Sequence, residues 1–247
     1  MNTLLLIIAT TIAISFISFI GALTLFIKEE ILDNVLLLLV SLSAGALIGG
    51  AFLHLLPRAV VQCAPSALVN LHLQVILGFV VFFMLEQFIQ WHHHHSTKHD
   101  KKPVSYLVLI SDSIHNFIDG LVIAASFVMG TGVGLVTTMA ISLHEIPQEI
   151  GDFGVLVYGG FSKKKALIVN FISQMTAVAG GFIGFYLSGM IDGFSLFLLP
   201  FAAGNFIYIA SSDLIPEIKH KENVKKSALH FFVFLLGILL MLGIKFI

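Results

Sequence analysis

Eight long apolar segments follow one another along this chain of 247 residues, and few folds can accommodate them. A bilayer core needs about 20 apolar residues per helix. Charged residues make up only 11% of the chain, against about 25% in soluble domains. We therefore predict an all-α integral membrane protein, one transmembrane domain over 1–247 whose eight helices contact lipid. The expected helices cover residues 3–27, 35–57, 71–91, 104–129, 133–159, 165–188, 194–215 and 228–247.

Lysine and arginine are unevenly divided between the two sets of expected loops. The loops after the first, third, fifth and seventh helices hold nearly all of them, and only Arg58 and Lys245 fall on the other side. The positive-inside rule then places those four loops in the cytoplasm and both termini outside. Short loops without an N-x-[ST] site favour a prokaryotic cytoplasmic membrane. A net charge of −1 gives no reason to expect a nucleic-acid partner.

Two short stretches are similar and occupy corresponding places in opposite-running helices. The second helix ends in "HLLP" at 54–57, and the seventh ends in "DLIP" at 213–216. Such a similarity is typical of an inverted repeat. We predict that helices 1–3 and 6–8 form the two repeats around helices 4 and 5.

The fourth and fifth helices carry polar residues in the middle of apolar runs, where an ionisable group costs a few kcal/mol. Their spacing places them on one face of helix 4 and on adjacent strips of helix 5. The two antiparallel helices must therefore turn these strips toward each other or toward water. The residues are Asp112, His115, Asn116 and Asp119 on helix 4, and His144, Glu145, Gln148, Glu149 and Asp152 on helix 5.

Imidazole nitrogen combined with carboxylate oxygen suits Zn²⁺ and other first-row divalent ions. Pro147 lacks an N–H, so it leaves the carbonyl of Leu143 free, which a membrane tolerates beside a cavity or a buried partner. Two other interpretations remain open: a hydrogen-bonded network that joins two helices, and a proton relay of Asp, Glu and His.

"HNFIDG" at 115–120 and "HEIPQEIGDF" at 144–153 resemble the signatures of the ZIP (Zrt-, Irt-like) divalent-metal transporters, in the branch whose fifth helix reads HExPHE. "HLLP" at 54–57 and "GNFIYIASSDLIPEI" at 204–218 are similar to that branch's helices 2 and 7. The resemblance implies eight helices, both termini outside, and a metal site between helices 4 and 5.

By position, the resemblance implies a primary metal site of His115, Asp119, His144 and Gln148. An adjacent site would use Asn116, Asp119, Glu145 and Gln148, and Glu149 completes the candidate ligands. Two departures from the family pattern bear on selectivity. Gln148 stands where the branch has a histidine, and Ser173 stands where some members have a glutamate.

Other polar residues lie near the ends of the expected helices. A histidine-rich cytoplasmic loop at 92–103 is interpreted as a site of weak metal capture or as solvated chain. His54 is a candidate entry ligand, Asp213 and Glu217 are candidate exit ligands, and Glu86 is expected to reach the interface.

We therefore expect an importer of a divalent metal cation, with Zn²⁺ first and Fe²⁺, Mn²⁺ or Cd²⁺ as alternatives. The metal is cargo, and no cofactor is expected. A proton-coupled small-solute carrier is the alternative function, and a homodimer is an open alternative for the assembly. An enzyme is not expected, because residues 144–148 read HEIPQ and lack the last histidine of the HExxH hydrolase motif.

Overall fold

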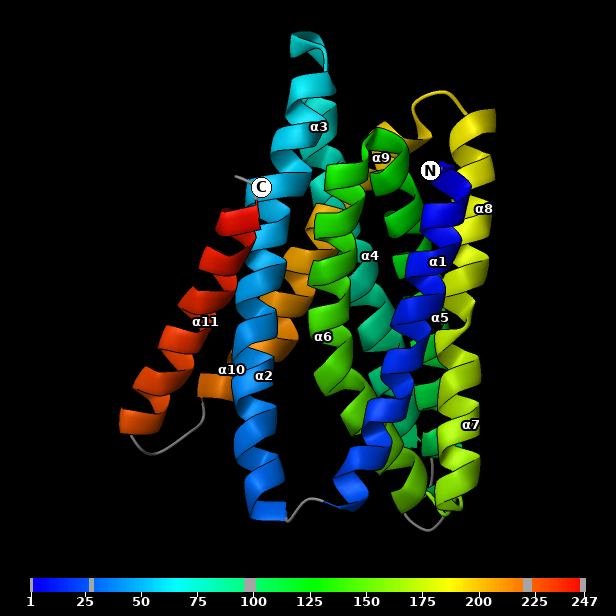
Figure 1. Ribbon diagram of the computed structural model, residues 1–247, viewed down its shortest axis with the longest axis vertical. Helices are drawn as coiled ribbons and strands as arrows, with labels where there is room; N and C mark the ends of the chain where they lie inside the picture. The colour runs from blue at the N-terminus through cyan, green and yellow to red at the C-terminus, as the bar shows by residue number, and fades with distance from the viewer. Residues whose placement is uncertain (1, 27–28, 96–100, 220–223, 245–247) are drawn as a thin grey trace.

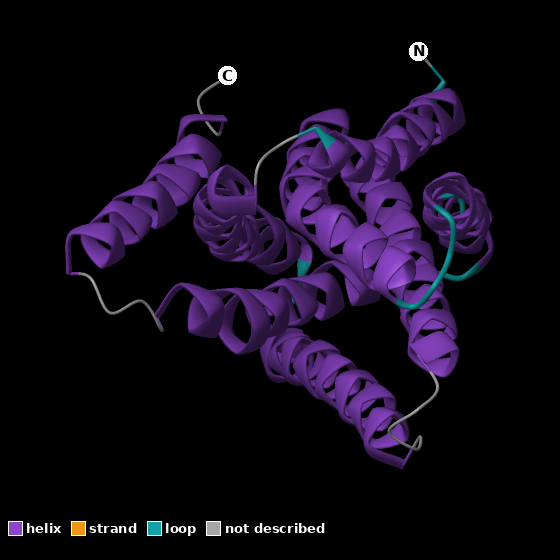
Figure 2. Ribbon diagram, turned by 90° about the horizontal axis from the view of Figure 1, so that it is seen from below, coloured by secondary structure: helices purple, strands orange, loops and turns teal. Residues whose placement is uncertain are grey.

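The computed structural model of the chain describes residues 2–26, 29–95, 101–219 and 224–244. Every regular element in these ranges is helical, and the helices form one bundle (Figures 1 and 2). The elements are α1 Thr3–Ser15, η1 Phe16–Leu25, α2 Glu29–Gly49, η2 Gly50–Leu55, α3 Leu56–Gln62, η3 Pro65–Ala67, α4 Leu68–His95, α5 Lys101–Met129, α6 Thr131–Tyr158, α7 Lys163–Gln174, α8 Thr176–Met190, α9 Phe194–Tyr208, η4 Ile209–Leu214, α10 Ile215–Lys219 and α11 Val224–Ile244.

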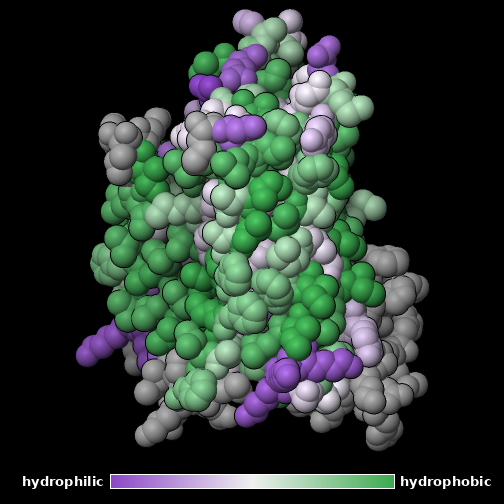
Figure 3. All heavy atoms as spheres, turned by 45° about the vertical axis from the view of Figure 1, so that its right-hand side comes forward, coloured by the Kyte–Doolittle hydropathy of each residue, from purple (hydrophilic) through white to green (hydrophobic). Residues whose placement is uncertain are grey.

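Consecutive elements join into eight long helical segments within the described ranges. Seven of them are long and apolar enough to cross a membrane. The eighth, α6, has 28 residues but carries the polar group predicted for helix 5. Figure 3 shows an apolar band between two ends at which hydrophilic residues gather. The prediction of an α-helical membrane bundle is confirmed, and α6 is the helix for which apolar character alone does not establish a crossing.

The eight segments pack as two groups. One group combines α1, η1, α5, α6, α7 and α8, and the other combines α2, α4, α9 and α11. The closest pairs are α5 with α8, α4 with α9, and α2 with α11. Each pair approaches through glycine: a Cβ added to Gly120, Gly204 or Gly45 would lie 2.0 Å from a carbonyl oxygen of the facing helix. Small residues allow such backbone contact, which stabilises helix pairs in lipid.

The predicted repeat is supported by one gapless alignment of the two parts of the chain. The alignment that pairs Pro57 with Pro216 also pairs Gly45 with Gly204 and Gly78 with Gly237, the glycines that bring α2 against α11 and α4 against α9. It matches the wide π-helical turns η2 and η4 as well, and each of these directly precedes the paired proline's helix. Helices α5 and α6 lie between the two repeats along the chain.

A tight turn makes α5 and α6 an antiparallel hairpin. Gly130 joins them with φ of 150°, a conformation that L-residues rarely adopt. The guanidinium of Arg58, from α3, donates to the carbonyl of Met129 at 2.7 Å and so caps the end of α5. This turn fixes the register in which the polar faces of the two helices meet.

Candidate metal site

Four side chains from α5 and α6 meet at one point inside the bundle. His115 and Asp119 come from successive turns of α5, while His144 and Glu145 are neighbours on α6. One ligand atom from each lies within 4.8 Å of the others. Asp119, His144 and Glu145 are buried, and His115 keeps 14% of its side chain exposed. We call these four residues the HDHE cluster.

The distances within the HDHE cluster match those expected around a small metal ion. Four ligands at about 2.0–2.1 Å from a tetrahedral zinc ion lie about 3.3 Å from one another. His144 Nε2 lies 3.2 Å from Asp119 Oδ2, 3.4 Å from Glu145 Oε1 and 3.2 Å from His115 Nε2. His115 Nε2 lies 3.7 Å from Asp119 Oδ2 and 3.6 Å from Glu145 Oε1. These five distances are close to the spacing of a tetrahedral donor set, and the two carboxylate oxygens lie within 4.8 Å of each other.

Neighbouring groups orient the two imidazole rings. His144 Nδ1 lies 3.3 Å from the carbonyl oxygen of Ala140, so a proton on Nδ1 leaves the Nε2 lone pair facing the cluster. The edge of Phe206 packs on the His144 ring, and Phe82 of α4 packs on the His115 ring. These contacts come from helices of the other packing group, which therefore help to hold the ligands.

The proline of α6 has the consequence expected from the sequence. Because Pro147 has no N–H, the carbonyl of Leu143 cannot receive the usual helical hydrogen bond from the residue four positions later. Ser43 Oγ of α2 lies 2.5 Å from that carbonyl oxygen and donates to it. A side chain of the other packing group thus replaces the missing bond, directly beside His144.

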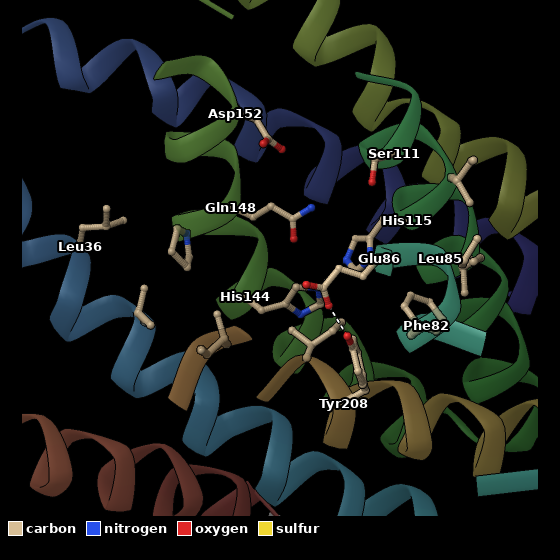
Figure 4. Close-up of a pocket in the computed structure, with 16 residues that line it drawn as sticks. Leu36, Phe82, Leu85, Glu86, Ser111, His115, His144, Gln148, Asp152 and Tyr208 are labelled. Carbon is tan, nitrogen blue, oxygen red and sulfur yellow. Dashed lines mark hydrogen bonds between the residues drawn. The ribbon is translucent and has the colours of Figure 1, made fainter. Parts of the chain in front are cut away.

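A cavity of about 410 Å³ reaches the HDHE cluster from one end of the bundle (Figure 4). Its lining follows α6 from His144 through Gln148 to Asp152, and α5 from His115 back to Ser111. On both helices this direction leads toward the ends that connect to the lysine-rich segments. The remaining lining comes from α2, α4, α9 and η4.

The opposite side of the HDHE cluster is closed by apolar side chains. Ile123 lies one turn beyond Asp119, and Ala140 one turn before His144, and neither has any exposed surface. Leu47 and Phe206 are equally buried and belong to the same core. The cavity thus reaches the cluster from the lysine-rich end, and the described residues named here on the other side are apolar and buried.

Comparison with known proteins identifies the family of the chain. The family model described as ZIP zinc transporter matches residues 4–107 and 91–245. The chain belongs to the ZIP family. It is 34% identical to zinc transporter ZIP13 of Pongo abelii over 220 residues, which cover 82% of this chain and 65% of that protein. It is 42% identical to zinc transporter zipt-7.2 of Caenorhabditis elegans over 144 residues, 57% of this chain and 31% of the relative. With human zinc transporter SLC39A7 it shares 38% over 149 residues, 58% of this chain and 32% of that protein. The aligned part of the chain thus spans between about a third and two thirds of the length of these relatives.

The other predicted ligands lie near the HDHE cluster but make different contacts. Gln148 lines the cavity one turn from His144, and its amide donates to Asp112 Oδ1 at 3.2 Å. In its place, Glu145 joins Asp119 and the two histidines. Asn116 is buried on the same α5 face, and Glu149 is buried and accepts a hydrogen bond from the amide of Asn170 on α7.

Residues predicted at the helix ends are only partly described. Helix α4 extends to His95 and α5 begins at Lys101, so Lys98 and His99 of the expected loop lie outside the described residues. His54 Nε2 lies 2.7 Å from the carbonyl oxygen of Met241, a contact with α11 rather than with the cavity. Ser173, at the family's glutamate position, bonds to Ser113 at 2.7 Å.

Two contributors to the site, Glu86 and Ser43, were not identified from the sequence. Glu86 was expected at the interface, but it lines the cavity and accepts a hydrogen bond from Tyr208. Its signal was present, because it is the sole acid between residues 68 and 95. Ser43 gave no signal, since one serine in an apolar helix commonly bonds to its own backbone.

Proposed function

We propose that this protein moves a divalent metal cation, with Zn²⁺ first, across a membrane through the HDHE cluster. The observation that carries the proposal is the donor set itself: two imidazoles and two carboxylates spaced like a zinc tetrahedron, at the inner end of a cavity open on one side. Mixed nitrogen and oxygen ligands can bind a cation firmly and still release it, as transport requires. Family membership supports the same cargo.

The direction of transport is proposed from charge. If the lysine-rich segments lie in the cytoplasm, as the positive-inside rule indicates, the cavity opens inward and the apolar seal faces outside. The arrangement described above would then be the one that releases cargo, and the protein would be an importer with both termini outside. A transporter, rather than a hydrolase, is the class consistent with the zinc transporters that the chain resembles.

The test is uptake into proteoliposomes that contain the purified protein. His144→Ala and Asp119→Ala are each expected to reduce Zn²⁺ uptake to the level of empty vesicles, because each removes a charge or lone pair from a four-ligand site. His72→Ala is the matched control, since His72 is exposed on α4 and bonds only to the carbonyl of Leu68 in its own helix. Normal uptake by a well-folded His144→Ala/Asp119→Ala double variant would refute the assignment.

A further inference from the structure

The carboxylate of Glu86 lies in the cavity wall that faces the HDHE cluster. Glu86 belongs to α4, whereas the cluster belongs to α5 and α6, so the two come from different packing groups. Tyr208, at the end of α9, donates its hydroxyl proton to Glu86 Oε2 (Figure 4). Ionisable residues within membrane helices are rare, and those that face a cavity mark ion pathways more often than structure.

The position of Glu86 along the cavity follows from its neighbour Phe82. Phe82 packs against the His115 ring, with the ring centroids 6.0 Å apart, and is therefore level with the cluster. Glu86 is four residues later on the same face of α4 and lies about 6 Å along the helix toward the lysine-rich end. Glu86 thus occupies the level that a cation reaches next when it leaves the cluster through the cavity.

The opposite wall carries polar groups at matching levels. His144, Gln148 and Asp152 follow one another at intervals of four residues along α6, and all three line the cavity. Between these walls the lining is mostly apolar, with Leu36, Val40 and Ile209 among it. A cation that passes such a surface needs charged or polar ligands at intervals of a few ångströms, because apolar wall cannot replace its hydration.

A purely structural role for Glu86 is less consistent with the packing. Its hydrogen bond with Tyr208 joins α4 to α9, but these helices already meet through backbone contact at Gly78 and Gly204. A glutamine at this position would still accept a hydrogen bond from Tyr208, so this bond by itself does not require the charge of Glu86.

We propose that Glu86 is a transit ligand for the metal cation between the HDHE cluster and the mouth of the cavity, and that Tyr208 weakens its hold. The tyrosine hydroxyl donates a hydrogen bond to one carboxylate oxygen of Glu86 and so stabilises its negative charge. The carboxylate then binds a passing cation more weakly. Such a ligand draws the cation out of the cluster without trapping it. The inference rests on the proposed transport of divalent metal.

The experiment separates binding at the cluster from passage beyond it. Wild-type protein and variants are reconstituted for Zn²⁺ uptake, and the cluster is titrated with Co²⁺ and followed by visible absorption. Glu86→Gln is expected to lower maximal uptake about tenfold, a loss typical of ligand-supporting groups, with the Co²⁺ spectrum and affinity unchanged. Tyr208→Phe is expected to lower both KM and maximal uptake, because the Glu86 carboxylate without the tyrosine hydroxyl binds the ion more tightly and retains it longer.

Matched controls are Asp192→Asn and Tyr186→Phe, both at exposed positions, and neither should change uptake. Wild-type uptake by Glu86→Gln would overturn the proposal while leaving the HDHE assignment intact. Loss of Co²⁺ binding in Glu86→Gln would also overturn it, since Glu86 would then be structural. Glu86→Asp, which keeps the charge, should retain more uptake than Glu86→Gln, and the reverse order would contradict a charge-based role. Failure of the proposed function is seen separately, as normal uptake in the His144→Ala/Asp119→Ala variant.

Discussion

Replacement of Ser43 by alanine isolates the hydrogen bond that compensates for Pro147. The Ser43 hydroxyl lies between two carbonyl oxygens, Leu143 of α6 at 2.5 Å and Leu39 of its own helix at 2.7 Å. The Leu39 carbonyl also has the backbone N–H of Ser43 available as a helical partner. The Leu143 carbonyl has no such donor, because the residue four positions later is proline. The variant therefore removes the Ser43 hydroxyl from a partly buried acceptor whose usual helical donor is missing.

The expected destabilisation follows from two ranges. A buried polar group left unsatisfied costs about 1–3 kcal/mol, whereas interhelical hydrogen bonds in membranes average about 0.6 and reach about 1.7 kcal/mol. We expect Ser43→Ala to lower the free energy of unfolding by about 1–2 kcal/mol, near the top of the membrane range because Pro147 removes the usual helical donor. Ser41→Ala is the control: Ser41 is equally buried on α2, but its hydroxyl bonds only to Leu37 of the same helix.

A double-mutant cycle with Pro147→Ala tests the cause directly. Alanine at 147 supplies an N–H that can reach the Leu143 carbonyl, so Ser43→Ala should cost much less in that background. Unfolding in detergent micelles, followed by circular dichroism or steric trapping, measures all four proteins. Equal losses for Ser43→Ala and Ser41→Ala, or the same Ser43→Ala loss with and without Pro147, would refute the reasoning.

Two further predictions concern metal choice and the histidine-rich segment. Gln148→His is expected to raise the preference for Zn²⁺ over Mn²⁺ and Fe²⁺ in competition uptake, because it places a third imidazole one turn from His144. Gln148→Asn is the control, since it keeps an amide and should leave the metal preference unchanged. Identical preferences in all three proteins would show that this position does not bind the cargo. Replacement of the histidines at 92–95 by serine should leave maximal uptake largely intact, since they come at the end of α4, after the proposed membrane passage. A complete loss of uptake would place them on the pathway.

The sequence was sufficient to predict the helical membrane fold and the two helices that form the site. Lipid requires ionisable groups to face inward, so the polar faces of α5 and α6 had to meet. Periodicity did not determine which of two adjacent strips on α6 would point at His115. Glu145 and Gln148 differ by about 60° around the helix axis, and the rotation that favours Glu145 comes from packing. The contacts of Ser43 and Glu86 depend equally on helices that are distant in sequence.

The inverted repeat gives the one-sided cavity a physical interpretation. Residues that the alignment pairs occupy different environments. Leu214 lines the cavity, whereas its partner Leu55 is wholly buried. Val40 also lines the cavity, whereas its partner Leu199 is wholly buried. Similar sequences on the two repeats therefore adopt an open packing at one end and a closed packing at the other. Because the repeats run in opposite directions, an exchange of these two packings would open the sealed end and close the lysine-rich end, with the HDHE cluster on α5 and α6 between them. If the proposed transport holds, such an exchange would expose the HDHE cluster to each end of the bundle in turn.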